Sequence, residues 1–243
     1  MSLTFFKNEV NRYTSNMRIV SGTYQGLHLY FQKNKHLRPT QDKVKQAIIN
    51  RIRSHISGAT VLDLYSGVGS YGLEMISNNC ESITFLDTHS SIIDKNLEMI
   101  CLSSVKQNIP LSFNSPQPEE FEITDAFIKE QFKQAQKKRN FGLKINETNI
   151  ERQTSTAQQF LKRTKNKYDI IFMDPPWTHP QYFEESLKAI AEFTILTPNG
   201  IIIVEHPKSV DLLQTGLKGQ IYDYGNTKIG IFEHETCHLP RKL

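Results

Sequence analysis

The stretch "FMDPPWT" at residues 172–178 carries the side chains best suited to chemistry. Asp174 directly follows the apolar run "YDIIFM", which predicts a strand. Pro175 and Pro176 fix φ at about −65° and keep Asp174 extended, so the strand ends in a stiff corner. This corner can present one carboxylate and one proline carbonyl side by side. Two such acceptors match the two N–H hydrogens of a base's exocyclic amine, and Trp177 offers a face for an unstacked base.

Such a corner suits methylation of an amine. An exocyclic amine is a poor nucleophile, because its lone pair is delocalised into the ring. Acceptors for both hydrogens can turn that lone pair toward a methyl donor, and the Asp174 carboxylate stabilises the positive charge that develops. The structural alternative is a strand-ending turn in which Asp174 caps a helix and Trp177 packs in the core.

A second motif, "DLYSGVGSYG", predicts a nucleotide-type cofactor site. Gly67, Gly69 and Gly72 form a G-x-G-x-x-G pattern between a strand and a helix, and Asp87 lies at the end of the next strand. Dinucleotides and S-adenosylmethionine both need such a turn and such an acid. Asp63, inside the first strand, favours S-adenosylmethionine, because a carboxylate can serve its ammonium group but repels a pyrophosphate. A dinucleotide site, or glycines that only allow close helix packing, are the alternatives.

The string "HETCH" at 234–238 matches the zinc motif H-E-x-x-H. Zinc binding needs His234 and His238 one helical turn apart. The preceding "KIGIFE" alternates with a period of two, which predicts a strand, and four strand residues separate the rings by roughly 13 Å. We therefore expect no metal site, and interpret the string as an exposed C-terminal edge.

The composition predicts one sizeable core with an appendage, since the 243 residues are 38% apolar and 22% charged. No apolar stretch approaches the ~20 residues that span a bilayer, and no secretory signal is evident. Cys80, Cys101 and Cys237 are odd in number and scattered, which excludes a disulfide scaffold and indicates a reduced, cytoplasmic protein. A formal charge of +4 and a pI near 8.8 permit a polyanionic partner without requiring one.

From Thr60 onward, short apolar runs alternate with amphipathic segments, which predicts a doubly wound, mostly parallel α/β sheet with helices on both faces. The predicted strands are "TVLDLYS", "SITFLD", "YDIIFMD" and "GIIIVEH". The predicted helices span 68–79, 90–106, 156–165 and 181–195, after a first helix capped by Thr40. The tail "IYDYGNTKIGIFEHE" predicts an antiparallel hairpin at one sheet edge.

Six segments in this order resemble one family: "RPTQDKVKQAI", "DLYSGVGSYGLE", "FLD", "MDPPW", "VEH" and "YGNTKIGIF". They are similar to those of the RsmD family of 16S rRNA (guanine-N2)-methyltransferases, which have a class I, Rossmann-like methyltransferase fold. The resemblance runs from about Met17 to His234, apart from residues 103–150. The D-P-P-aromatic motif is shared with other amino-methyltransferases. The "RPT" segment and a chain end soon after the last hairpin are more particular to this family.

The resemblance implies a role for each matching residue. The S-adenosylmethionine site would comprise Asp63, Tyr65, Gly67, Gly69, Asp87, Thr88, Thr156 and Ala157, with Asp87 on the ribose and Thr88 beside the adenine. The catalytic corner would comprise Asp174, Pro175, Pro176 and Trp177, with the Pro175 carbonyl as the second acceptor and Trp177 stacked on the guanine. Arg38, Lys43 and Lys45 would face the RNA.

The chain departs from the family's pattern at three positions. Thr156 stands where Asp or Asn is usual near the adenine amine, Trp177 where Phe or Tyr is usual, and Leu27 where a basic residue is common.

The composition and the order of the segments also predict a division of the chain. Residues 1–16 form a lead that is disordered or partly foreign to the natural protein, and 17–38 form a small β-hairpin extension. Residues 39–243 form the methyltransferase domain. Within it, 103–150 have a Pro/Ser-rich start, an acidic patch and a helix with "KKR", which indicates an inserted surface excursion.

The implied function is methyl transfer from S-adenosylmethionine to a guanine N2 amine in 16S rRNA, naked or in an assembling small subunit. The enzyme would be cytoplasmic and monomeric, with no metal and no membrane. A DNA adenine or cytosine amino-methyltransferase shares the D-P-P-aromatic motif, but generally has a separate target-recognition domain. An NAD(P)-binding oxidoreductase leaves Asp63 and the corner unexplained, and a catalytically silent RNA-binding relative is the third alternative.

Overall fold

The computed structural model describes residues 17–31, 42–114, 122–212 and 218–233. The expected lead, Arg38, the predicted cap Thr40 and the "HETCH" string lie outside the described residues.

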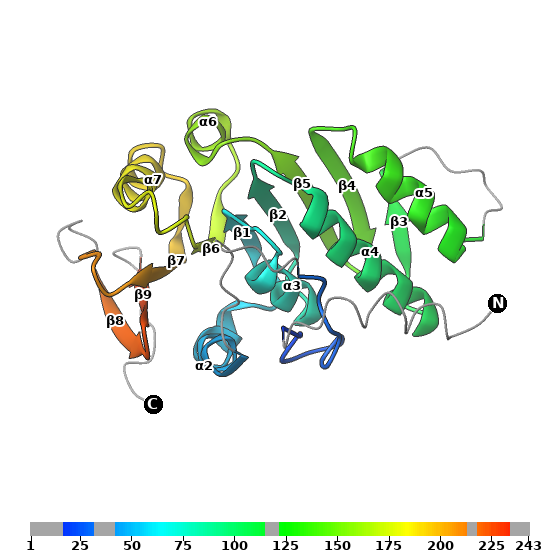
Figure 1. Ribbon diagram of the computed structural model, residues 1–243, viewed down its shortest axis with the longest axis horizontal. Helices are drawn as coiled ribbons and strands as arrows, with labels where there is room; N and C mark the ends of the chain where they lie inside the picture. The colour runs from blue at the N-terminus through cyan, green and yellow to red at the C-terminus, as the bar shows by residue number, and fades with distance from the viewer. Residues whose placement is uncertain (1–16, 32–41, 115–121, 213–217, 234–243) are drawn as a thin grey trace.

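Nine strands in the described residues form one sheet in the order β3-β4-β5-β2-β1-β6-β7-β9-β8 (Figure 1). They are β1 Thr60–Leu64, β2 Ser82–Asp87, β3 Leu111–Phe113, β4 Asn140–Ile145, β5 Thr148–Thr154, β6 Tyr168–Met173, β7 Leu196–Pro207, β8 Gly219–Tyr224 and β9 Thr227–Glu233. The five strands from β5 to β7 are parallel, and the strands beyond them are antiparallel. The predicted doubly wound sheet and its C-terminal hairpin are confirmed.

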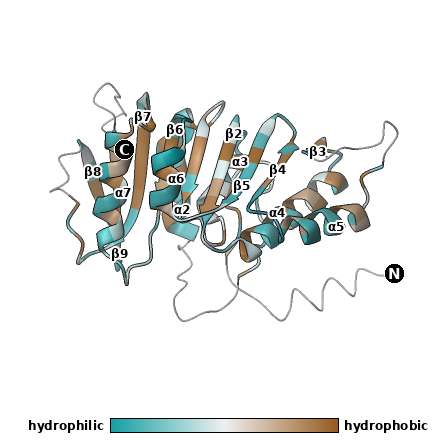
Figure 2. Ribbon diagram, turned by 90° about the horizontal axis from the view of Figure 1, so that it is seen from above, coloured by the Kyte–Doolittle hydropathy of each residue, from teal (hydrophilic) through white to brown (hydrophobic). Residues whose placement is uncertain are grey.

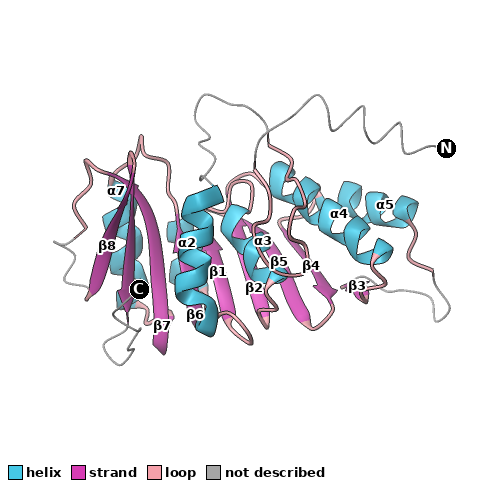
Figure 3. Ribbon diagram, turned by 90° about the horizontal axis from the view of Figure 1, so that it is seen from below, coloured by secondary structure: helices cyan, strands magenta, loops and turns pink. Residues whose placement is uncertain are grey.

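Helices cover both faces of this sheet (Figure 3). They are α2 Asp42–Ile52, the short 3-10 helix η1 Arg53–His55, α3 Ser70–Ser77, α4 Ser91–Lys106, α5 Asp125–Ala135, α6 Ala157–Arg163 and α7 Gln181–Glu192. One core cluster joins α2, α3, α4 and α5 to one face, and a second joins α6 and α7 to the other. The central strands are therefore apolar on both sides (Figure 2). No helix in the described ranges is long and apolar enough to cross a membrane.

The described part of segment 103–150 is not a surface excursion, which corrects our expectation. It completes α4, adds β3, α5 and β4, and begins β5, which pairs with β2 in the parallel part of the sheet. Phe113, Phe132 and Leu143 from this segment are buried in the larger core cluster. The segment joins the core because its few apolar side chains recur at strand and helix spacing, although its overall composition is polar. The proposed division into domains stays a prediction.

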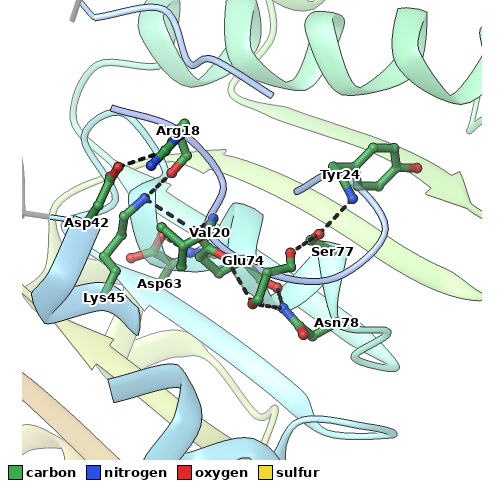
Figure 4. Close-up of polar contacts among 11 residues, drawn as sticks. Arg18, Val20, Tyr24, Asp42, Lys45, Asp63, Glu74, Ser77 and Asn78 are labelled. Carbon is green, nitrogen blue, oxygen red and sulfur yellow. Dashed lines mark hydrogen bonds and ion pairs between the residues drawn. The ribbon is translucent and has the colours of Figure 1, made fainter. Parts of the chain in front are cut away.

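The N-terminal extension is a tight antiparallel loop rather than a pair of long strands. A bridge joins Arg18 to His28, and Leu29 donates its N–H to the Met17 carbonyl (3.0 Å). The loop binds the end of α3, because the Thr23 N–H donates to the Ser77 carbonyl (2.8 Å) and the Tyr24 N–H donates to the Ser77 hydroxyl (2.9 Å). The extension is thus part of the domain's core rather than a free appendage (Figure 4).

Lys45 lies inside this joint, which corrects its expected position on the RNA-facing surface. Its ammonium group is fully buried, forms an ion pair with Glu74 (3.2 Å) and donates to the Arg18 carbonyl (2.5 Å; Figure 4). Glu74 also accepts the Val20 N–H (2.7 Å). Burial raises the pKa of the Glu74 carboxyl, and the charge of Lys45 opposes that rise. Lys45 therefore joins α2, α3 and the N-terminal loop, while its neighbour Lys43 is exposed.

We expect Lys45→Met to destabilise the protein by about 3–5 kcal/mol at pH 8, because the variant leaves the buried Glu74 carboxylate without a cation. The loss should shrink at pH 5, where a raised pKa lets Glu74 take up a proton. Urea unfolding at both pH values measures this. Lys43→Met, the same change on the exposed neighbour, should alter stability by less than about 0.5 kcal/mol. Equal stabilities of the two variants would contradict the buried pair.

Candidate active site

The glycine motif forms the turn from β1 into α3, at the carboxyl edge of the sheet. Tyr65, the first residue after β1, has a left-handed backbone (φ 66°), which is strained for a residue with a side chain. Gly69 (φ 79°) precedes the first turn of α3, and a Cβ there would collide with Ile93. The turn therefore depends on backbone conformations that side chains disfavour, and on a glycine where α3 begins.

Asp63 supports this turn from inside β1. Its carboxylate accepts the Gly72 N–H from the first turn of α3 (3.0 Å), and its side chain is almost completely buried. A Cβ at Gly72 would collide with the Phe85 ring and the Asp63 carboxylate, so only glycine lets α3 approach this closely. Burial raises the pKa of Asp63 to about 7; the hydrogen bond from Gly72 opposes this rise and the charge of Asp87 adds to it.

Asp87 ends β2 beside the same turn. One of its carboxylate oxygens accepts the Gly67 N–H (2.8 Å). The other accepts the His89 N–H (3.0 Å) and the Thr88 hydroxyl (3.3 Å). Thr88 is exposed at this edge. Asp87 thus braces the glycine turn while its half-buried carboxylate remains at the surface, where a ligand's hydroxyl groups can reach it.

Three carboxylates meet at this edge of the sheet. Asp174 follows β6, and Glu205 lies near the end of β7. The charges of Glu205 and Asp63 both act on the Asp174 carboxyl. Burial raises the pKa of Asp174 well above its ordinary value, with further rises from the charges of Glu205 and Asp63, while the Trp177 side chain lowers it by hydrogen bonding. Like charges this close in a low dielectric disfavour one another's ionisation, so the cluster attracts a cation.

Glu205 and its partner Tyr71 were not predicted as site residues. The Tyr71 hydroxyl donates to Glu205 (2.9 Å), and its ring stacks on Phe172 of β6 with centroids 4.8 Å apart. The sequence did carry a signal: the acid in "VEH" occupies the same place after an apolar strand as Asp87 and Asp174 do. The three acids come from β1, β6 and β7, which are neighbours in the sheet only once it has formed.

Two buried hydroxyls of the turn lack partners within the described residues. The Ser66 and Ser70 hydroxyls flank the glycines, are nearly inaccessible and form no hydrogen bond there. An unsatisfied buried polar group is costly, so these groups fit a polar ligand seated on the turn. Together with the acids, they offer a cofactor an acidic environment for a cationic group and hydroxyls for a polar one.

The D-P-P-W segment forms the predicted stiff corner after β6. Pro175 is buried and Pro176 is exposed. The Pro176 carbonyl accepts the His179 N–H (2.9 Å). Among the described residues no backbone hydrogen bond ends on the Pro175 carbonyl, and its role as a substrate acceptor stays a prediction. Trp177 is half-buried against the second core cluster rather than enclosed by it.

A row of aromatic rings runs beside this corner. Tyr65 stacks on Tyr182 of α7 with centroids 6.0 Å apart, and Tyr182 stacks on His179 at 5.1 Å. The Tyr65 hydroxyl is within 2.8 Å of the Ser186 hydroxyl, and burial raises the pKa of Tyr65 to about 12. Tyr65 is therefore neutral and serves as a fixed aromatic wall. The sequence did not single out His179, Tyr182 or Ser186, because their place depends on how α7 packs.

Thr156 and Ala157 lie at the start of α6, next to Asp87. The Ser155 N–H donates to the Asp87 carbonyl (3.0 Å), which places the two segments together. The Thr156 hydroxyl accepts the Gln159 N–H (3.3 Å) and so caps α6, while Ala157 is buried. Their contact with the adenine stays a prediction. In the described residues, no group of three or more His, Cys, Asp or Glu side chains could hold a metal ion.

Comparisons with known proteins agree with this geometry. A family model described as "Conserved hypothetical protein 95" matches residues 17–124 and 124–233. Ribosomal RNA small subunit methyltransferase D of Haemophilus influenzae is 27% identical over 202 residues, which cover 81% of this chain and 82% of that protein. The putative rRNA methyltransferase YlbH of Bacillus subtilis is 30% identical over 203 residues, which cover 82% and 87%.

The solved structure of the putative methyltransferase yhhF of Escherichia coli superposes with a TM-score of 0.60 at 18% identity, over 90% of this chain and 98% of that chain. The sheet order and the glycine turn thus define a class I methyltransferase fold. The chain belongs to the family described as Conserved hypothetical protein 95, the RsmD family of methyltransferases. The expected family and fold class are confirmed.

We expect Asp63→Asn to make folding stability less dependent on pH. In the native protein Asp63 keeps a proton up to a pKa of about 7, whereas an unfolded aspartate loses it at about 4. Between these values the folded state binds more protons, so its stability falls as pH rises. From pH 5 to pH 8 the native protein should lose about 2–3 kcal/mol relative to the variant, measured by urea unfolding. Parallel pH curves for the two proteins would contradict the buried acid.

Proposed function

We propose that the protein transfers a methyl group from S-adenosylmethionine to the N2 amine of a guanine in small-subunit rRNA. The observation that carries this proposal is the convergence of Asp63, Asp174 and Glu205 beside the glycine turn. The family supports methyl transfer, and the name of the Haemophilus relative supports ribosomal RNA of the small subunit as the substrate. We further propose that the enzyme acts as a cytoplasmic monomer without a metal.

The residues of the turn fit S-adenosylmethionine, which when bound supplies a methyl group on a positively charged sulfur. Asp63 would serve the ammonium group, with the Ser66 and Ser70 hydroxyls as further polar partners. Asp87 would accept hydrogen bonds from the ribose hydroxyls. Thr88 and the start of α6 would lie at the adenine. A dinucleotide fits less well, because its pyrophosphate would meet the acids that converge here.

The D-P-P-W corner would hold the target amine. The Asp174 carboxylate and the Pro175 carbonyl each accept one N–H, so the nitrogen lone pair faces the donor. Both acceptors would be held in place before the substrate arrives, since the prolines restrict the corner. Trp177, half-buried beside the Tyr65 and Tyr182 rings, gives the base an aromatic face. Flipping the base out of its stack exposes both of its faces to these side chains.

The raised pKa of Asp174 fits its role. The nitrogen gains positive charge as it bonds the methyl carbon, and the sulfur keeps the electrons of the bond that breaks. An ionised Asp174 stabilises that charge, and its high proton affinity suits it to receive the proton that the nitrogen then loses. The positive charge of the bound cofactor favours the ionised form before the reaction starts.

We expect Asp174→Ala to lower the rate of methyl transfer by at least about a hundredfold to a thousandfold, because it removes charge stabilisation at the reacting nitrogen. S-adenosylhomocysteine should bind within about threefold of its native affinity, because Asp174 belongs to the amine side of the site. Single-turnover transfer from labelled S-adenosylmethionine to undermodified small subunits measures the rate. Calorimetry measures the affinity for S-adenosylhomocysteine.

Asp174→Asn is the matched control, since it keeps the shape and one acceptor but removes the charge. Its rate should stay close to that of the alanine variant if charge is what matters. Undiminished transfer by either variant would contradict the proposed chemistry.

We expect the methyl group to appear on one guanine N2 of the small-subunit rRNA. Labelled cofactor, undermodified subunits and nuclease mapping followed by mass spectrometry identify the base. Naked 16S rRNA in parallel tells whether the assembled particle is needed. Label on adenine or cytosine of duplex DNA, with none on rRNA, would support a DNA amino-methyltransferase instead.

A further inference from the structure

The turn between α5 and β4 carries three consecutive cations, Lys137, Lys138 and Arg139. All three side chains are exposed, and no ion pair joins any of them to another described residue. We propose that this basic turn binds the backbone phosphates of single-stranded RNA next to the methyl-transfer site. The proposal deepens the proposed function and rests on it for the identity of the RNA.

A buried arginine fixes the backbone of the basic turn. The Arg152 guanidinium, from β5, is 1% exposed and donates to the Ala135 carbonyl (2.7 Å), the Lys138 carbonyl (2.8 Å) and the Arg139 carbonyl (3.2 Å). Its Nε–H forms an ion pair with Asp94 of α4 (2.9 Å), and a further N–H donates to the Thr154 hydroxyl (3.1 Å). The carbonyls at the end of α5 are the negative end of the helix dipole, so a cation is favoured there.

This arrangement lowers the entropic cost of binding RNA. A buried guanidinium is tolerated only where its donors are satisfied, and here they are satisfied by the basic turn itself and by Asp94. The turn's backbone is therefore ordered before a ligand arrives, and only the ends of three side chains remain to be placed.

The basic turn lies on the same edge of the sheet as the cofactor residues. Asp87 pairs with Thr154 across β2 and β5, and the Thr154 N–H donates to the Arg139 carbonyl (2.8 Å). Two strand spacings separate the Asp87 and Arg139 backbones, which is about 10 Å. Figure 1 shows α5 turning into β4 at the edge where β5 leads into α6. A strand whose target base enters the site can therefore pass over the basic turn.

The surface beside Lys138 is hollowed in a way that suits a nucleobase. The hollow has a volume of about 320 Å³ and is lined by the half-buried Phe141 ring and by the side chains of Asn140, Gln153 and Glu151. The ring offers stacking and the amides offer hydrogen bonds. The Glu151 carboxylate disfavours a phosphate inside the hollow. Phosphates would thus lie on the cationic rim and a neighbouring base in the hollow.

The test replaces the three cations with alanine in the full-length protein. The matched control is Lys162→Ala, Lys165→Ala and Lys167→Ala, which removes three positive charges from exposed side chains between the end of α6 and the start of β6, near the opposite edge of the sheet. Fluorescence anisotropy with a short single-stranded RNA of mixed sequence, over a range of salt concentrations, measures affinity and its salt dependence. Calorimetry with S-adenosylhomocysteine checks the cofactor site in both variants.

For the basic-turn variant we expect RNA affinity to fall about tenfold or more, and the slope of log affinity against log salt to fall by about 2, because each phosphate contact on a single strand contributes about 0.7. The control should change affinity by less than about threefold, and both variants should bind S-adenosylhomocysteine normally. An unchanged salt slope, or an equal loss in the control, would overturn the basic turn as an RNA site. The native protein's transfer to rRNA is scored separately, so a failure of the proposed function is distinguishable from a failure here.

Discussion

The structure depends on three acids gathered at one edge of the sheet, where their ionisation is disfavoured. Asp63, Asp174 and Glu205 come together where β1, β6 and β7 reach the carboxyl edge of the sheet. Burial holds the pKa values of Asp63 and Asp174 above their ordinary range; repulsion from Asp87 adds to the rise of the first, and repulsion from Glu205 and Asp63 adds to the rise of the second. Such a cluster lowers the stability of the folded chain, and a cationic ligand relieves the repulsion. The order of β1, β6 and β7 in the sheet keeps these acids in place.

Elsewhere in the described residues, buried charges of opposite sign form two ion pairs. Glu74 has Lys45, and Arg152 has Asp94 together with the carbonyls at the end of α5. These two pairs join the N-terminal loop and the chain's additional α5–β4 segment to the sheet. Ion pairs thus order the periphery, whereas acids of a single sign mark the site. The contrast separates structural charges from functional ones on physical grounds.

Much of this architecture could be predicted from the sequence, because each central strand is an apolar run ended by an acid or a glycine. The DPPW corner and Asp87 followed from the same pattern. Lys45 could not be placed by its charge alone, although it lies three and four residues before Ile48 and Ile49, at the spacing of the apolar stripe of α2, and is buried as they are. Segment 103–150 was misjudged because its polar composition hides the few apolar side chains that join the core. Glu205 needed the sheet order, which brings β7 beside β6.

The central claim is that the cluster of acids binds the positive charge of S-adenosylmethionine. Calorimetry near pH 6 in two buffers of different ionisation enthalpy counts the protons released on binding. S-adenosylmethionine should release more protons than S-adenosylhomocysteine, because only the former carries the sulfonium charge that drives Asp174 to ionise. Equal proton release for the two ligands, or none for either, would contradict the account.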